Sequence, residues 1–342
     1  MLILILELTI MLVVIVVAAI LFTNSLEHIG QRLKISDGLT GSVFAAIGTA
    51  LPETVIPILA IASTPYNLSI NSEIGMGSIL GAPLMLSTLS TTLMALSVVN
   101  LRGITGIIEP ERTGFIRDLN FFILSFLIVL ITAFIPEEKL LIKVFCCGIL
   151  LIIYIVYIFL VIRASKKLVN EGYGTKVDEP IMLTKLKFPD NSMTLLLQLI
   201  ISLSLLVIGA KGFIHEIEKI SNYFGIPAFL ITIFIAPLAT EMPEKINSIL
   251  WIRKKKDTLA FGNITGAMVF QASLLPVIGI LFTPWKAGFE FAGAIIITLI
   301  AAIWLRLNAR KGGIPIWVLL LNGLCYLMYL IMILYRTIDI KS

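Results

Sequence analysis

Long apolar runs separated by short polar segments dominate the pattern of this chain of 342 residues. A helix of about 20 consecutive apolar residues is long enough to cross the hydrocarbon core of a bilayer. The first run has neither a basic start nor a small-residue cleavage site, so we expect it to be retained rather than removed as a signal peptide. The pattern predicts ten spans in all, at residues 2–23, 38–63, 75–98, 116–135, 140–162, 193–213, 225–251, 258–282, 288–306 and 314–335.

The longest polar connection, residues 163–192, divides these spans into two groups of five. We expect residues 1–162 and 193–342 to form two five-helix units joined by this linker. The linker is too short to be a soluble domain of ordinary size. The chain should therefore be an all-α polytopic membrane protein with ten transmembrane helices.

Composition and charge support a membrane protein and indicate its orientation. Apolar residues make up 58% of the chain and charged residues only 14%, with a mean hydropathy of +1.02, far from ordinary soluble usage. When the connections alternate between two sides, 18 of the 26 lysines and arginines fall on the side of residues 163–192 and 6 on the other. The positive-inside rule then predicts a cytoplasmic linker and extracellular termini in a cell membrane. Topology thus explains the net charge of +5 without a nucleic-acid partner.

A short motif occurs once in each half. "GTALPE", Gly48–Glu53, aligns with "ATEMPE", Ala239–Glu244, and each lies in the second span of its group of five. Each is followed by a span rich in small residues, 75–83 and 264–272. Because five is odd, the second group must cross the membrane in the opposite sense, which predicts two inverted five-helix repeats. A chance recurrence would require the matched span and the matched partner span to be coincidences as well.

The prolines of the motif affect the helix backbone. Proline has no N–H, so Pro52 leaves the carbonyl of Gly48 without its helical donor, and Pro243 does the same for Ala239. A free carbonyl at membrane depth is tolerated where it lines a cavity or finds a partner. We therefore expect the helix to open at both motifs.

The side chains of the motif add oxygen ligands to these carbonyls. Thr49 lies four residues before Glu53, and Thr240 four before Glu244, so each pair shares a helix face. A glutamate at membrane depth is functional by default, although a structural, protonated glutamate would also fit. Two inverted copies facing each other would form an oxygen cage with Glu53 and Glu244 as its charged metal ligands. Such hard ligands suit Ca²⁺ or Na⁺ rather than a soft metal.

The paired motifs and their partner spans resemble the repeats of the cation/Ca²⁺ exchanger superfamily, specifically its sodium/calcium exchanger membrane region. The resemblance implies that Glu53 and Glu244 are the central cation ligands, with Thr49 and Thr240 beside them. It also places Ser78 of the first partner span in the cation site. The resemblance covers the whole layout of five plus five spans, but specific matches are confined to the four motif-bearing spans.

Three positions depart from that family's pattern. Ala82 and Gln271 stand where sodium/calcium members typically carry Asn or Asp, so one ligand is lost and one is neutral. Glu241 is an extra acid where the family usually has a small residue. If Glu241 faces the cavity it adds a titratable group, and H⁺ then becomes a candidate counter-ion beside Na⁺. Alternatively, Glu241 pairs with Lys245, four residues later, at the lipid edge and takes no part in the site.

The leading hypothesis is a secondary active antiporter that exchanges Ca²⁺, or a similar divalent cation, for Na⁺ or H⁺ by alternating access. Its partners would be the lipid bilayer and inorganic cations, with no cofactor. A cation channel with a carboxylate constriction remains open from sequence alone. An intramembrane enzyme is disfavoured, because all six aspartates fall at loops or span ends and no Ser–His or zinc set is present. The three cysteines show no metal-ligand spacing.

Overall fold

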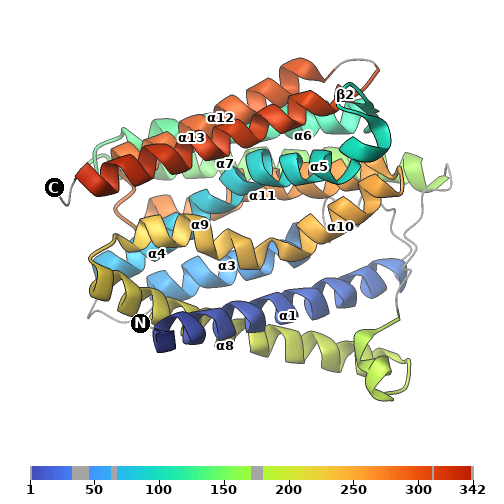
Figure 1. The fold of residues 1–342 in the computed structure, drawn as a ribbon, viewed down its shortest axis with the longest axis horizontal. Helices are drawn as coiled ribbons and strands as arrows, with labels where there is room; N and C mark the ends of the chain where they lie inside the picture. The colour runs from blue at the N-terminus through green and yellow to red at the C-terminus, as the bar shows by residue number, and fades with distance from the viewer. Residues whose placement is uncertain (1, 33–45, 63–67, 171–179, 310–311, 340–342) are drawn as a thin grey trace.

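The chain forms a bundle of long helices that run nearly parallel to one another (Figure 1). A computed structural model describes residues 2–32, 46–62, 68–170, 180–309 and 312–339. Within the described residues, eight helices are long and apolar enough to cross a membrane, and two shorter apolar helical segments accompany them. The all-α membrane fold expected from the hydrophobic pattern is therefore present. The helices are α1 (Leu2–Arg32), α3 (Ala46–Ala62), α4 (Leu68–Met85), α5 (Thr91–Arg102), α6 (Arg112–Ala133), α7 (Leu140–Asn170), α8 (Ser192–Phe224), α9 (Ala228–Thr240), α10 (Met242–Arg253), α11 (Asp257–Phe282), α12 (Phe289–Asn308) and α13 (Ile316–Asp339).

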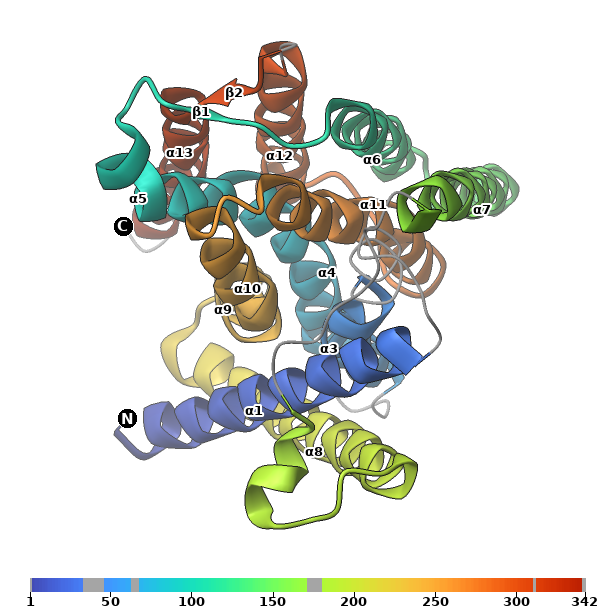
Figure 2. The same cartoon turned by 90° about the vertical axis from the view of Figure 1, so that its right-hand side faces the viewer.

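The helices are arranged around a central group. Viewed along the bundle, α1 and α8 lie side by side at one edge, whereas α6, α7, α12 and α13 lie at the opposite edge (Figure 2). Between them lie α3, α4, α9, α10 and α11. The helices that carry the two sequence motifs and their partner spans are therefore the interior of the bundle.

The α4–α5 unit is one long span with a local defect. Pro83 lies inside α4, and a π-helical turn, Leu86–Ser90, links α4 to α5. Hydroxyl groups satisfy carbonyls at this turn: Thr88 donates to the carbonyl of Leu84 and Thr91 to that of Ser87. Such side-chain bonds let an interrupted helix remain in an apolar environment.

Glycines allow α4 to approach α9 closely. A Cβ atom at Gly77 would lie 2.8 Å from the carbonyl oxygen of Phe229, and one at Gly81 would overlap the carbonyl oxygen of Ile233. The spacing Gly77-x-x-x-Gly81 places both on one face of α4, a pattern that brings helix backbones together in membranes. A helix from the first half of the chain is thereby fixed against one from the second half.

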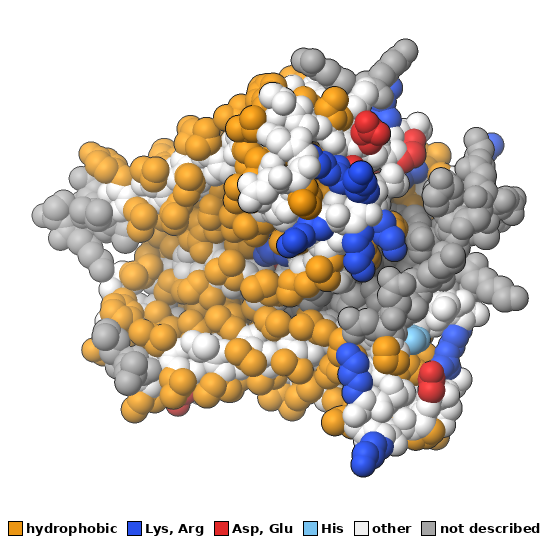
Figure 3. All heavy atoms as spheres, turned by 45° about the vertical axis from the view of Figure 1, so that its right-hand side comes forward, with side chains coloured by type: hydrophobic (Ala, Val, Ile, Leu, Met, Phe, Trp, Pro, Cys, Tyr) orange, Lys and Arg blue, Asp and Glu red, His pale blue; other side chains and the backbone are white. Residues whose placement is uncertain are grey.

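The two ends of the bundle differ in charge. Both termini lie at the same end (Figure 1). Lys and Arg side chains gather toward the other end, while apolar side chains cover much of the remaining visible face (Figure 3). The exposed basic residues of this end include Arg112 and Arg253–Lys256. At the same end the Arg102 guanidinium forms two 2.7 Å bonds to the Asp257 carboxylate, and a short antiparallel pair joins β1 (Ile107–Ile108) to β2 (Ile314–Pro315).

Several helices are longer than the predicted spans; α1 runs to Arg32 rather than 23 and α8 to Phe224 rather than 213. Helix α7 continues to Asn170, and a 3₁₀ turn, Met182–Leu186, precedes α8, so helical structure enters the predicted linker from both sides. The segment 33–45, which holds the predicted start of the second span, lies outside the described residues. Long helices commonly extend beyond the apolar core into the interface, which hydropathy does not register.

Candidate functional site

The second motif interrupts its helix. Helix α9 ends at Thr240, Glu241 stands between the helices with φ −94° and ψ 7°, and α10 starts at Met242. Pro237 and Pro243 have no N–H, so one helical hydrogen bond is missing on each side of Glu241. The backbone N–H of Glu241 still makes the ordinary helical bond to the carbonyl of Pro237 at 3.2 Å, so the interruption lies after this residue. The expected opening is therefore present in this copy.

The first motif differs. Helix α3 runs without interruption from Ala46 to Ala62, through Gly48 and Pro52, so the expected opening at this copy is wrong. Helix α3 also contains Pro57, and missing hydrogen bonds at prolines can be absorbed as kinks within a continuous helix. The side chains of residues 46–52, which include the predicted ligand Thr49, lie outside the described part of the chain.

Three glutamates come together in the interior. Glu53 of α3, Glu241 at the helix break and Glu244 of α10 are each at most 3% exposed. The Glu53 carboxylate interacts electrostatically with both Glu241 and Glu244. Acids that are 191 residues apart in the sequence thus form one buried cluster, which we call the acid cluster (Glu53, Glu241 and Glu244).

Gln271 joins the acid cluster from α11. Its amide nitrogen donates to Oε2 of Glu53 at 2.5 Å, and the side chain also lies within reach of Glu241. Among the described residues, Oε1 of Glu53 and Oε1 of Gln271 have no hydrogen-bond partner. Buried oxygens are normally satisfied, so this pair of oxygens presents free lone pairs to the interior.

The other predicted ligands surround this cluster to different extents. Thr240 is buried and donates its hydroxyl to the carbonyl of Ala236 at 3.2 Å, which leaves its oxygen lone pairs available. Ala239 is buried beside it. Ser78 is buried on α4, and within the described part of the chain its hydroxyl has no hydrogen-bond partner. No described hydrogen bond joins Ser78 to the acid cluster.

The position of Glu244 is fixed from α11. The Asn263 amide donates to the backbone carbonyl of Glu244 at 3.3 Å and to the Ser248 hydroxyl at 3.0 Å. The Ser248 hydroxyl donates to the carbonyl of Ala260. These bonds hold the first turns of α10 against α11, so the direction of the Glu244 side chain depends on both helices.

Lys245 lies in the interior of the bundle, a location that the sequence pattern did not indicate. Its ammonium lies 3.3 Å from Oε2 of Glu241, so the predicted pairing is present. Both side chains are buried, however, at 5% and 0% exposure, so the predicted location at the lipid edge is wrong. The spacing of four residues could indicate the pair but not whether its helix face points to lipid or to the interior.

Carboxylates dominate the cluster, yet they do not converge on one point. No group of three or more His, Cys, Asp or Glu side chains within the described residues is arranged to hold a metal ion. Because Lys245 pairs with Glu241, a cation between Glu53 and Glu244 would need neutral oxygens, such as Gln271 or backbone carbonyls, to complete its coordination. Neutral oxygens are ordinary ligands for Ca²⁺.

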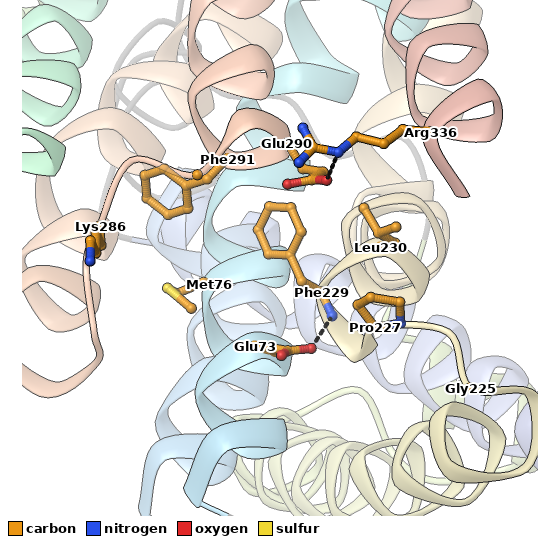
Figure 4. A pocket seen from close by; sticks show the side chains of 11 residues that line it. Glu73, Met76, Gly225, Pro227, Phe229, Leu230, Lys286, Glu290, Phe291 and Arg336 are labelled. Atoms are coloured by element: carbon orange, nitrogen blue, oxygen red, sulfur yellow. Dashed lines mark hydrogen bonds and ion pairs between the residues drawn. The ribbon is translucent and has the colours of Figure 1, made fainter. Parts of the chain in front are cut away.

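A pocket of about 400 Å³ opens at the end of the bundle that carries the termini (Figure 4). It contains Glu73 of α4, whose carboxylate accepts from the backbone N–H of Phe229 at 3.3 Å. On the other side, Glu290 and Arg336 form an ion pair of 3.0 Å. Met76, Phe229 and Leu230 line the pocket as apolar groups. Glu73 is therefore a pocket residue on helix α4.

Comparisons with known proteins agree with this architecture. The family model described as "Sodium/calcium exchanger protein" matches residues 3–163 and 194–335. The chain is 23% identical to the "Putative antiporter CaxA" of Alkalimonas amylolytica, over 80% of this chain and 79% of that protein. Its fold is similar to that of the H⁺/Ca²⁺ exchanger CAX, with a TM-score of 0.74, 15% identity and coverage of 97% of this chain and 82% of that one. It is also similar to the sodium-calcium exchanger NCX_Mj, with a TM-score of 0.62, 20% identity and coverage of 96% and 98%.

Proposed function

This chain belongs to the sodium/calcium exchanger protein family, and from that premise we propose that it is a secondary active antiporter that exchanges Ca²⁺, or a similar divalent cation, for Na⁺ or H⁺. Members of this family are membrane transporters of Ca²⁺ rather than enzymes. The acid cluster carries the proposal. Buried carboxylates from both halves of the chain interact with one another, and such charges inside a membrane protein require a cation or a proton to balance them.

The proposed cation site consists of the Glu53 and Glu244 carboxylates, with Gln271 as a neutral ligand. Oε1 of Glu53 and Oε1 of Gln271 support this assignment, because both are buried without a hydrogen-bond donor in the described part of the chain. Thr49, Thr240 and Ser78 would contribute hydroxyl oxygens, and the carbonyls of Gly48 and Ala239 are further candidates. One divalent cation would neutralise Glu53 and Glu244, as would two monovalent cations, so cargo and counter-ion compete for the same charge.

We further propose ten membrane crossings in two inverted repeats, 1–162 and 193–342, joined by 163–192. The two segments matched by the family model, 3–163 and 194–335, support this division. Helix α3 and the α9–α10 pair would be the two crossings that are missing from the eight long apolar helices. Both termini lie at one end of the bundle, as an even number of crossings requires.

Alternating access would expose the acid cluster to one side of the membrane at a time. The pocket at the end of the termini is a candidate entrance, because Glu73 lies in it and Ser78 follows on the same helix. Its apolar residues Met76, Phe229 and Leu230 would separate the entrance from the cluster in the present conformation. Movement of α4 relative to α9 would have to disturb their glycine-mediated contact.

The function can be tested by ⁴⁵Ca²⁺ uptake into proteoliposomes. We expect saturable uptake that requires a counter-ion gradient. Outward gradients of Na⁺ and of H⁺ are imposed in separate experiments, and the gradient that drives uptake identifies the counter-ion. Protein-free liposomes under the same gradients give the background. A net Ca²⁺ current that needs no ion on the opposite side would instead indicate a channel, and absence of uptake under both gradients would contradict the proposal.

The orientation gives a second test. We expect both termini outside and residues 163–192 in the cytoplasm, because most lysines and arginines lie on the side of this linker. In a chain without native cysteines, Lys185→Cys should react with a membrane-impermeant maleimide only after the cells are opened. Glu137→Cys, in the exposed α6–α7 connection of the opposite side, should react in intact cells. The reverse labelling pattern would overturn the orientation.

A further inference from the structure

Lys245 is a buried cation inside the acid cluster. Its ammonium contacts Oε2 of Glu241 at 3.3 Å, the carbonyl oxygen of Pro237 at 2.9 Å and the Met85 sulfur at 2.9 Å. An ammonium group has three N–H donors, and here it donates to the carbonyl of Pro237 and the sulfur of Met85 and forms an ion pair with Glu241. The charge is therefore surrounded by protein groups in the interior of the bundle.

The location of this ammonium relates it to the proposed cargo site. Lys245 directly follows Glu244 in the chain, and its charge acts on the Glu53 carboxylate across the helix interface. A carboxylate oxygen and a backbone carbonyl are also the kind of oxygen ligands that hard cations use. The carbonyl of Pro237, one turn before Glu241, also accepts from the backbone N–H of Glu241 at 3.2 Å, so it accepts two hydrogen bonds.

A charge count separates the roles of the three acids. With all groups ionised, Glu53, Glu241 and Glu244 carry three negative charges, and Lys245 carries one positive charge. Counted over these four described residues, the cluster then has a net charge of two negative units, which one divalent cation or two monovalent cations would balance. Without Lys245 the net charge would be three negative units, and one divalent cation could not neutralise it.

We propose that the Lys245 ammonium is a tethered cation that permanently occupies one ion position of the site. It neutralises Glu241 and thereby sets the exchange at one divalent cation for two monovalent cations. This inference rests on the proposed antiport function and goes beyond it, because it assigns the ion stoichiometry to one residue. It also gives Glu241 a role, as the anchor of the tethered charge rather than a ligand of the cargo.

Removing the tethered charge should create a site for a mobile cation. Lys245→Ala leaves space next to the Glu241 carboxylate, which Na⁺ or methylammonium can enter. We expect the melting temperature of purified Lys245→Ala to rise with added NaCl or methylammonium chloride, relative to choline chloride at equal ionic strength, by a larger increment than that of the unchanged protein. Ca²⁺ affinity without added Na⁺ should rise by roughly ten-fold or more, because a neighbouring positive charge is lost.

Three variants control this experiment. Lys143→Ala removes another buried lysine, whose ammonium donates to the carbonyl of Trp285 away from the acid cluster, and should gain no Na⁺ dependence. Lys245→Arg keeps the charge and should gain none either. In the charge-balanced pair Glu241→Gln with Lys245→Met, the net charge of the unchanged site is restored, so the gain in Ca²⁺ affinity should disappear. A purely structural ion pair would leave both the Na⁺ response and the Ca²⁺ affinity of Lys245→Ala unchanged.

Transport measurements complete the test and separate it from the proposed function. Ca²⁺ uptake by the unchanged protein should not respond to a membrane potential imposed with K⁺ and valinomycin, because one divalent cation exchanges for two monovalent cations. If the unchanged protein transports Ca²⁺ but its uptake follows the potential, or if Lys245→Ala gains no cation response, the tethered-cation assignment is wrong. If the unchanged protein neither binds nor transports Ca²⁺, the antiport function itself fails.

Discussion

Replacing Glu53 or Glu244 with glutamine should reduce Ca²⁺ uptake at least roughly 100-fold, which corresponds to about 2.7 kcal/mol. The amide keeps the shape of the side chain but removes the negative charge that balances a divalent cation. The proteins should still fold, because glutamine keeps the size of the side chain and removes the cost of burying a charge. Uptake into proteoliposomes measures transport, and a monodisperse elution profile with a retained melting transition verifies folding.

A buried acid outside the cluster provides the matched control for this result. Glu216 of α8 is 5% exposed and pairs with Lys219 at 2.8 Å, and Glu216→Gln should retain Ca²⁺ uptake. Near-normal uptake in both cluster variants would mean that these carboxylates do not hold the cation. If Glu216→Gln also lost uptake, the effect would be due to a buried amide in general rather than to loss of a ligand at the proposed cation site.

Gly81→Ala should have the second largest effect. The new methyl group would overlap the carbonyl oxygen of Ile233 and lie 2.8 Å from Cγ of Pro237, so α4 would have to move away from α9. Overpacking of this kind costs about 1–3 kcal/mol. We expect a melting temperature lower by several degrees. Transport should also be slower, because α4 carries Ser78 and α9 ends directly before Glu241, so a shift of either helix would displace these residues. Thermal unfolding in detergent and ⁴⁵Ca²⁺ uptake measure the two effects.

Gly148 of α7 provides the comparison for Gly81. A Cβ atom there would meet nothing within 4 Å, so Gly148→Ala should leave stability unchanged or raise it slightly, as alanine favours helix. An equal loss of stability in Gly81→Ala and Gly148→Ala would show that the close approach of α4 and α9 is not responsible.

The hydrophobic pattern predicted the helical spans well, for a physical reason. A membrane requires long apolar segments, and the predicted spans 116–135, 140–162 and 258–282 correspond to α6, α7 and α11 within a few residues at most ends. The pattern could not predict that α4 and α5 are joined through a π-helical turn, because all these residues are apolar or small. Nor could it place the end of α7 at Asn170, because a helix can continue into the polar interface.

The site was predicted in its parts rather than in its arrangement. The repeated motif identified Glu53 and Glu244, and the structure brings both into one buried cluster. Gln271 was predicted as a neutral ligand of the site, but its direct hydrogen bond to Glu53 could not be predicted. Lys245 was assigned to the lipid edge because sequence spacing fixes a helix face relative to other residues but not relative to the bundle. The two motifs have similar sequences, so the sequence could not predict that the helix is continuous at the first motif and interrupted at the second.

The burial of the acid cluster has a kinetic consequence for an empty carrier. A conformational switch through a closed state would trap the ionised Glu53 and Glu244 away from water, with Lys245 as the one ammonium that the described residues place among the three carboxylates. An uncompensated buried ion costs several kcal/mol, and each 1.36 kcal/mol in a barrier slows a step ten-fold. The unloaded protein should therefore remain on one side of the membrane while the loaded protein crosses, so slippage is suppressed by electrostatics and needs no separate gate.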